Sequence, residues 1–189
     1  SNMDKIYQDN QIIGGVNLSV QFAQKVQLTQ KERMLLEDQK SHEEVCIKEY
    51  QDYASRVHCT ELKQLFNNLA SKEQEHLNTI NQLLNGEIPQ MSSSQSGQSG
   101  QSGQQWSQSG QQFSQQSTSQ SQSYNQEDAT LCTHMLMTEK YVSGAYNTAI
   151  FEFKDPNIRQ ILNHIQKEEQ EHGEQIFNYM YQHGMYNPQ

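Results

Sequence analysis

The sequence has little of what several common protein classes require. Its three cysteines include no Cys-x-x-Cys pair, which excludes a structural zinc ribbon or a rubredoxin-like iron site. No run approaches the roughly 18 consecutive apolar residues that a transmembrane helix needs. Lys and Arg number 13 against 22 Asp and Glu, and the net charge of −9 argues against a nucleic-acid-binding or anionic-membrane surface. Nor is there an alternating pattern typical of β-strands.

The start of the chain also lacks the charged-then-apolar pattern of a secretory signal peptide. An odd number of cysteines without such a signal is typical of reduced thiols inside a cell. We therefore expect a protein that is made in the cytoplasm.

Charge is missing from one long internal segment, residues 88–126. Within it, 29 of the 32 residues from 92 to 123 are Ser, Gln or Gly. Such a tract buries too little apolar surface to offset its ordering entropy, so we predict a disordered linker. Three roles fit this composition: an inert spacer, a self-associating assembly segment, or a substrate for cross-linking through its glutamines.

Periodicity and capping signals predict four helices in the rest of the chain, over about 30–57, 61–85, 127–153 and 156–183. Thr29 with Glu32 forms a capping box before the first helix, and Thr60 is the expected cap of the second. Asp155-Pro156 ends the third helix and opens the fourth.

The two helix pairs are copies of each other. A shift of 96 residues places the first pair on the second without gaps, with Glu73 on Glu169 and His76 on His172. We therefore predict an all-α four-helix bundle made of two helical hairpins and a long crossover. The expected units are an N-terminal arm (1–28), the first hairpin (29–86), the linker (87–126) and the second hairpin (127–186).

The expected core stripes contain polar residues where a packed bundle normally has apolar ones. In the second helix the stripe of 4- and 3-residue steps passes through Glu73 and His76. The fourth helix repeats this arrangement, and the first and third each contribute one inward glutamate. The six residues are Glu43, Glu73, His76, Glu139, Glu169 and His172.

The two glutamates of each hairpin are also equally far from its turn. The midpoint of Glu43 and Glu73 is position 58, and the midpoint of Glu139 and Glu169 is position 154. Residues equidistant from the turn of an antiparallel hairpin lie side by side, here about 22 Å from the turn. If the hairpins pack with pseudo-two-fold symmetry, four carboxylates and two imidazoles meet in one layer.

Four buried carboxylates need compensating positive charge or protons, because an uncompensated buried charge is strongly destabilising. Two divalent cations would balance four negative charges, and a mixed carboxylate and imidazole set suits iron or manganese. We predict a centre of two divalent ions, Fe or Mn, bound by the six residues. The alternative is a metal-free layer of protonated carboxylates and hydrogen-bonded histidines.

Tyr50 and Tyr146 lie one heptad after Glu43 and Glu139 on the same stripes. They fit two roles equally well: packing in the core, or orienting the ligand carboxylates through their hydroxyls from a second shell.

These motifs carry a family resemblance. The segment from Glu43 to Ala54 and the motif Glu73-x-x-His76 resemble the ferritin-like and rubrerythrin-like superfamily. The second half looks more like the Coat F spore-coat family, in Glu139-Lys140 before Tyr146, Asn157-Ile158-Arg159, Glu168-Glu169-Gln170 and Gly184-Met185-Tyr186. The resemblance covers roughly residues 29–86 and 127–186. It implies a ferritin-like bundle with these six residues as metal ligands, and an association with the spore coat. The iron–thiolate domain of rubrerythrins is absent.

Three functional hypotheses follow. The first is a structural or accessory protein in the spore coat of a spore-forming bacterium, with other coat proteins as partners and a retained di-metal centre. The second is a di-iron or di-manganese oxidoreductase acting on peroxide, dioxygen or Fe(II), like a peroxidase, catalase or ferroxidase. The third is a metal store, although one bundle holds only two ions. The long linker would also allow a homodimer by hairpin swapping.

Overall fold

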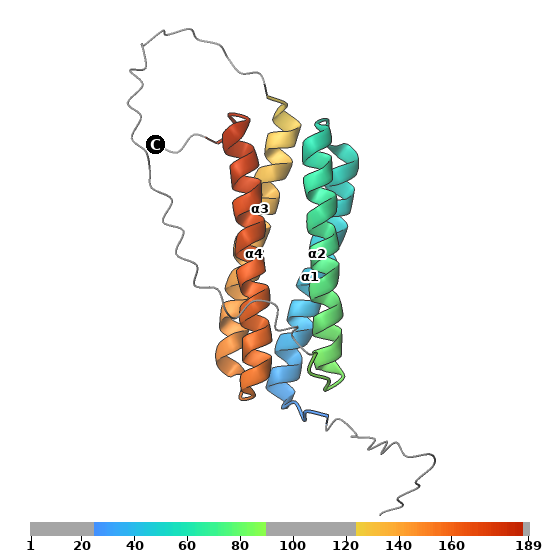
Figure 1. Ribbon diagram of the computed structural model, residues 1–189, viewed down its shortest axis with the longest axis vertical. Coiled ribbons are helices and arrows are strands. Elements are labelled where there is room, and N and C mark those ends of the chain that lie inside the picture. The colour runs from blue at the N-terminus through green and yellow to red at the C-terminus, as the bar shows by residue number, and fades with distance from the viewer. Residues whose placement is uncertain (1–24, 90–123, 187–189) are drawn as a thin grey trace, which may run out of the picture.

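The computed structural model describes residues 25–89 and 124–186, which form a bundle of four α-helices (Figure 1). The helices are α1 (Gln30–Arg56), α2 (Thr60–Leu84), α3 (Gln126–Glu152) and α4 (Pro156–Gln182). These described ranges contain no strand, and the helices pair as two hairpins, which confirms the predicted all-α four-helix bundle. Most of the expected arm (1–28) and of the expected linker (87–126) lies outside the described residues.

Local sequence sets most of the helix ends. Thr29 and Glu32 form the predicted capping box of α1. Asp155 caps α4, where its carboxylate accepts from the next two free backbone N–H groups, and Pro156 occupies the first turn. After α2 the chain turns at Gly86, whose φ of 77° favours glycine.

The N-cap of α2 lies one residue before Thr60, near the position expected from the sequence. Thr60 is the first helical residue, and Cys59 takes the N-cap position without a side-chain capping hydrogen bond. Asp128 of α3 accepts the backbone N–H groups of His58 and Cys59, at 3.0 and 3.3 Å. The turn between α1 and α2 is thus stabilised by a distant carboxylate that short-range signals do not reveal.

The same contact occurs in the opposite direction at the other end of the bundle. Glu32 of α1 accepts the backbone N–H of Lys154 in the turn between α3 and α4, at 3.1 Å. Glu32 and Asp128 are 96 residues apart, the period of the internal repeat, and each is 2% exposed. Each hairpin therefore holds the turn of the other, as pseudo-two-fold symmetry requires.

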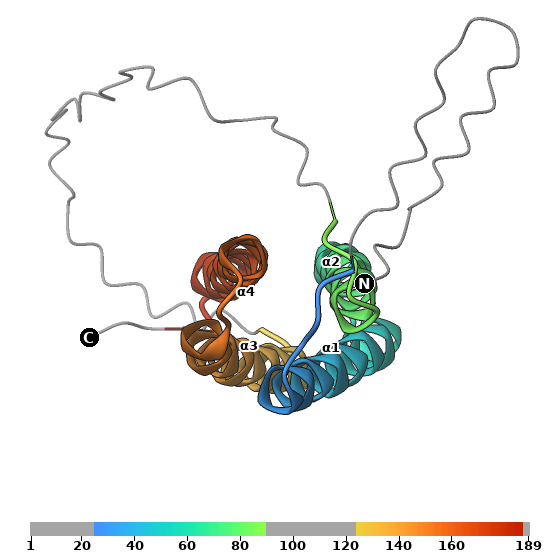
Figure 2. The ribbon, with the colours of Figure 1, turned by 90° about the horizontal axis from the view of Figure 1, so that it is seen from below.

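Helix directions match the predicted topology. In Figure 1, α2 ends at the opposite end of the bundle from the start of α3, so that α2 and α3 run the same way. Figure 2, seen along the bundle, places the helices at four corners, with α1 beside α3 and α2 facing α4. The contact between α1 and α3 is the closer of the two contacts between hairpins.

The apolar core is divided into two clusters along the bundle. The first cluster contains Ile80, Ile165 and, beside the turn between α3 and α4, Phe153. The second cluster contains Phe66 and Ile176. Along α2, α3 and α4 the predicted polar residues lie between these clusters, whereas Glu43 of α1 lies between Leu36 and Cys46 of the first cluster. No helix in the described ranges is long and apolar enough to cross a bilayer.

Candidate metal centre

The structure brings all six predicted ligand residues together in the bundle core. Each is at most 3% exposed. Their oxygen and nitrogen atoms form two groups, and within each group the atoms lie within 4.8 Å of one another. The first group is Glu43, Glu73, His76 and Glu169, and the second is Glu73, Glu139, Glu169 and His172. Glu73 and Glu169 belong to both groups, so one carboxylate from each hairpin lies at the centre.

Both histidines turn the same ring nitrogen toward the layer. His76 Nδ1 lies 3.0 Å from Glu169 Oε1 and 3.3 Å from Glu73 Oε2. His172 Nδ1 lies 2.9 Å from Glu73 Oε1 and 3.7 Å from Glu169 Oε2. The two rings stack, with centroids 5.5 Å apart and planes 18° apart. Each shared carboxylate therefore places one oxygen near each histidine.

The histidines favour the charged form of the two shared carboxylates. Burial raises the pKa of Glu73, but hydrogen bonds from His172 and His76 outweigh burial and bring this pKa below its ordinary value. Burial also raises the pKa of Glu169, but its ion-pair contacts with His172 and His76 outweigh burial and bring this pKa below its ordinary value. Burial lowers the pKa of His172, but Glu169 and Glu73 raise it to about 9. The pKa of His76 is raised as well, by its contacts with Glu168, Glu169 and Glu43 against the effect of burial.

The other two carboxylates favour the protonated form. Burial raises the pKa of Glu43 well above its ordinary value, and the neighbouring charge of Glu169 raises it further despite the contact with His76. Burial and Glu169 raise the pKa of Glu139 in the same way. Without metal, the layer thus favours two carboxylates, two neutral carboxylic acids and two imidazolium rings. These charges sum to zero.

Hydrogen bonds do not satisfy every oxygen of this layer. Four buried carboxylate oxygens of the layer have no hydrogen-bond partner among the described residues: Glu43 Oε2, Glu139 Oε2, Glu169 Oε1 and Glu169 Oε2. Outside the layer, Glu49 Oε2 also lacks one. His76 Nδ1 is near Glu169 Oε1, but this contact lacks hydrogen-bond geometry. Buried polar atoms are rarely left unpaired. The layer therefore contains oxygen atoms whose hydrogen-bonding capacity the described residues do not fill.

The two tyrosines contact the site across the hairpins. The hydroxyl of Tyr50 in α1 donates to Glu139 Oε1 of α3, and that of Tyr146 in α3 donates to Glu43 Oε1 of α1. Both tyrosines are 0% exposed. Each hydroxyl therefore holds one oxygen of a glutamate from the opposite hairpin, which leaves the other oxygen without a partner.

Glu168 also contacts the site, although it is not among the six residues that the sequence predicted. Its Oε2 lies 2.9 Å from His76 Nε2, the ring nitrogen that faces away from the layer, and 3.5 Å from His164 Nε2. The hydrogen bond with His76 lowers the pKa of Glu168. The repeat matches Glu168 with Lys72, so the repeat gave no signal for this contact.

Several polar residues outside the layer lie on helix surfaces or at helix ends. Glu75 and Glu171 pair with lysines on exposed helix faces. His183 is the C-cap of α4. It forms, with Cys59 and Glu61, a third group of potential ligand atoms near the turn between α1 and α2. This group is partly or fully exposed. Metal analysis must therefore distinguish it from the buried layer.

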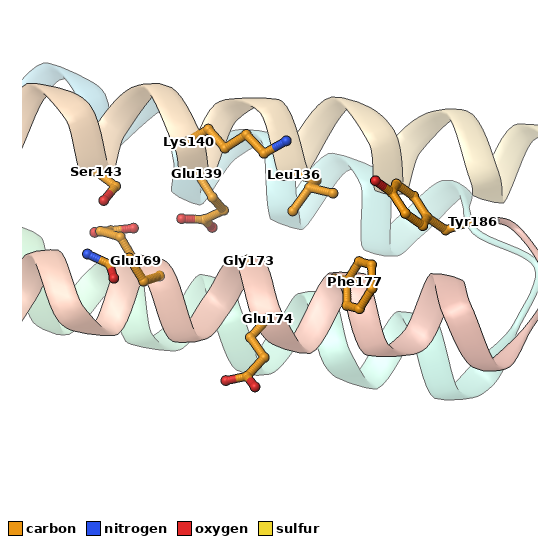
Figure 3. A pocket seen from close by; sticks show the side chains of 10 residues that line it. Leu136, Glu139, Lys140, Ser143, Glu169, Gly173, Glu174, Phe177 and Tyr186 are labelled. Carbon is orange, nitrogen blue, oxygen red and sulfur yellow. The ribbon is translucent and has the colours of Figure 1, made fainter. Parts of the chain in front are cut away.

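A cavity of about 490 Å³ between α3 and α4 reaches the layer from outside (Figure 3). Glu139 and Glu169 belong to its lining and point toward each other between the two helices. The sequence alone did not predict this cavity. Since Glu139 and Glu169 are at most 2% exposed, the cavity ends at the buried layer on the side of the second hairpin.

Comparisons with known proteins inform only part of the chain. Neither the curated proteins nor the solved structures contain a match. Residues 127–189 match the family model of the Coat F domain. This range begins one residue into α3 and extends beyond α4, so it contains the second hairpin and its half of the ligand layer. The second hairpin is therefore similar to the Coat F family.

Proposed function

We propose that this protein is a structural or accessory component of the bacterial spore coat, built as a ferritin-like bundle that holds two divalent ions, Fe or Mn. The match of residues 127–189 to the Coat F domain supports the coat assignment. The metal assignment rests on one observation: two buried groups of four ligand residues share Glu73 and Glu169. Two groups that share carboxylates are the arrangement that two bridged ions require.

The residues fit such a centre in number, type and charge. Glu43 with His76 would complete the binding of one ion, and Glu139 with His172 that of the other. Glu73 and Glu169 would bridge the two ions. Four carboxylate oxygens accept no hydrogen bond from the described residues and would be available to the ions. Carboxylate and imidazole donors suit iron or manganese. The hydroxyls of Tyr50 and Tyr146 would orient Glu139 and Glu43 through hydrogen bonds without binding the ions themselves.

Metal analysis tests the centre directly. The protein should be produced in iron- and manganese-supplemented medium, and in a Cys59→Ser background so that the exposed group does not contribute. Elemental analysis should then give about two ions per chain. A chain that binds no iron or manganese under either condition refutes the metal assignment and favours the metal-free layer.

The coat assignment has its own test. A tagged copy expressed in a sporulating host should be found in the coat fraction of purified spores, together with other coat proteins. Recovery only from the mother-cell or forespore cytoplasm would refute it. Light scattering of the purified protein would show whether hairpins swap between two chains, because a swapped homodimer has twice the monomer mass of 21.9 kDa.

A second function, a di-metal oxidoreductase acting on peroxide, dioxygen or Fe(II), is favoured by the cavity that reaches Glu139 and Glu169. Bound iron or manganese would supply the redox chemistry. The chain's own residues would position the ions, and the cavity would admit peroxide or dioxygen. Loss of hydrogen peroxide on addition to metal-loaded protein tests this function. A protein that binds two ions but does not consume hydrogen peroxide would contradict the peroxidase or catalase activity and favour the structural role.

A further inference from the structure

The cavity between α3 and α4 has a polar base and mainly apolar walls. Glu139 and Glu169 line its inner end, and three of the four unpartnered carboxylate oxygens of the layer belong to these two residues. Leu136, Phe177 and Tyr186 form the apolar walls, and Phe177 contacts Tyr186 edge to face with ring centroids 5.1 Å apart. Figure 3 shows the two carboxylates side by side and the aromatic rings farther along the same space.

Two small residues keep this space open. Ser143 of α3 and Gly173 of α4 line the cavity next to the carboxylates. Gly173 has an ordinary helical φ, so its backbone does not require glycine. A Cβ at this position would lie 3.9 Å from the Cβ of Glu139 and 3.6 Å from Leu136 Cδ1. Any longer side chain would therefore extend into the space beside Glu139.

The first hairpin carries large residues at the matching positions. A shift of 96 residues pairs Ser143 with Ile47 and Gly173 with Leu77. Ile47 is 8% exposed and Leu77 is half-buried. The two hairpins therefore share the candidate ligand residues, but the side chains beside them are small only in the second hairpin.

The charges at the mouth of the cavity balance. Lys140 and Glu174 both line it, one from each helix, and both are exposed. With opposite charges at the mouth and apolar walls behind, the cavity favours neutral solutes over ions, since an ion would lose hydration without gaining a partner along the walls.

We propose that this cavity is the route by which small neutral molecules reach the layer, and that Ser143 and Gly173 set its width. The entering substrate class is a neutral molecule of peroxide or dioxygen size. The route rests on the proposed metal centre. It predicts that exogenous molecules approach the ion held by Glu139 and His172, not the one held by Glu43 and His76.

The first test blocks the route. Nitric oxide, a neutral ligand of Fe(II), is mixed with Fe(II)-loaded protein and its binding is followed by stopped-flow absorbance. Gly173→Leu, which installs the residue of the first hairpin, should slow binding by about tenfold or more while two ions remain bound. Gly144→Leu is the matched control, because nothing lies within 4 Å of a Cβ at that position. It should leave the rate unchanged.

A second test needs no metal. In the Cys59→Ser background, Ser143→Cys should react faster with a small maleimide than Ile47→Cys, and adding Gly173→Leu should slow the reaction at position 143. Equal labelling at positions 143 and 47 would overturn the route. So would an unchanged nitric oxide rate in a Gly173→Leu protein that retains two ions. Wild-type protein that binds no metal overturns the proposed function instead, and this separates the two failures.

Discussion

The two hairpins are identical where the chemistry lies and different immediately around it. Each contributes two glutamates and one histidine at the same level, and each tyrosine hydroxyl binds a glutamate of the opposite hairpin. Beside these residues the first hairpin has Ile47 and Leu77 where the second has Ser143 and Gly173. The comparison indicates that the ligand set constrains the chain more tightly than its surroundings do, so one side could open without loss of the site.

A second difference concerns the histidines. His76 has Glu168 at its outer nitrogen, at 2.9 Å. The repeat places Lys72 at the position matching Glu168, and Lys72 instead pairs with Glu75 on the surface. Among the described residues, no such outer contact is found for His172. Two otherwise equivalent half-sites thus differ in how firmly their histidines are held.

The largest expected effect tests the equivalence of the hairpins. Glu73→Gln and Glu169→Gln each change a residue that belongs to both ligand groups, so we expect either variant to lose both ions. Glu43→Gln and Glu139→Gln each change one group only, and each should retain about one ion. Elemental analysis in the Cys59→Ser background gives the stoichiometry.

Matching results for the members of each pair would support pseudo-two-fold symmetry of the layer. Replacement by Gln keeps the side-chain volume, and circular dichroism should show unchanged helix content in all four variants. If Glu73→Gln and Glu43→Gln lost the same number of ions, Glu73 would not be a shared ligand.

The next effect concerns pH in the metal-free protein. The folded-state pKa of His172 is about 9, above its ordinary value, so its contribution to stability is complete below pH ~6.5 and is lost as pH rises toward 9. Over this pH range the contribution of His172 to the free energy of unfolding falls by about 3 kcal/mol at most. Glu43 and Glu139 act in the same direction because burial raises their pKa values. Urea unfolding in chelator between pH 6 and 9 should show this loss.

The comparison between the hairpins is sharpened by observing each imidazole. The pKa of His76 is raised further, because Glu168 binds its outer nitrogen, so His172 should deprotonate first as pH rises. NMR of the histidine ring protons would give the order. Stability that stays flat or rises from pH 6.5 to 9 would contradict the assigned protonation states.

A smaller effect is expected for metal affinity at one half-site. The carboxylate of Glu168 orients His76 and makes its imidazole more basic, and Glu168→Gln removes this carboxylate. Loss of such an outer contact typically weakens metal binding by about 10–100-fold. Lys72→Gln changes the matching position and touches no ligand, so it should leave both affinities unchanged. Competition with a chromophoric chelator resolves the two ions. Equal weakening of both would show that Glu168 does not act through His76.

Sequence reasoning predicted the helices and the six candidate ligand residues that meet in the core, because both leave periodic signals. Glu73 and His76 interrupt an apolar stripe, and their level follows from counting residues to the turn. Glu168 and Asp128 left no such signal, since their partners lie 92 and 70 residues away and depend on how the hairpins pack. The cavity beside Gly173 could be found only from the repeat, by asking where a large residue had become small.

The smallest expected effect lies at the two turns, where the hairpins differ in helix capping. Asp155 accepts backbone N–H groups at 2.8 and 3.2 Å, whereas the side chain of Cys59 makes no capping hydrogen bond. Asp155→Ala should therefore lower the free energy of unfolding by about 1 kcal/mol, and Cys59→Ala by much less. Urea unfolding of both variants in chelator measures the difference. Equal losses would mean that the thiol of Cys59 caps α2 as the carboxylate of Asp155 caps α4.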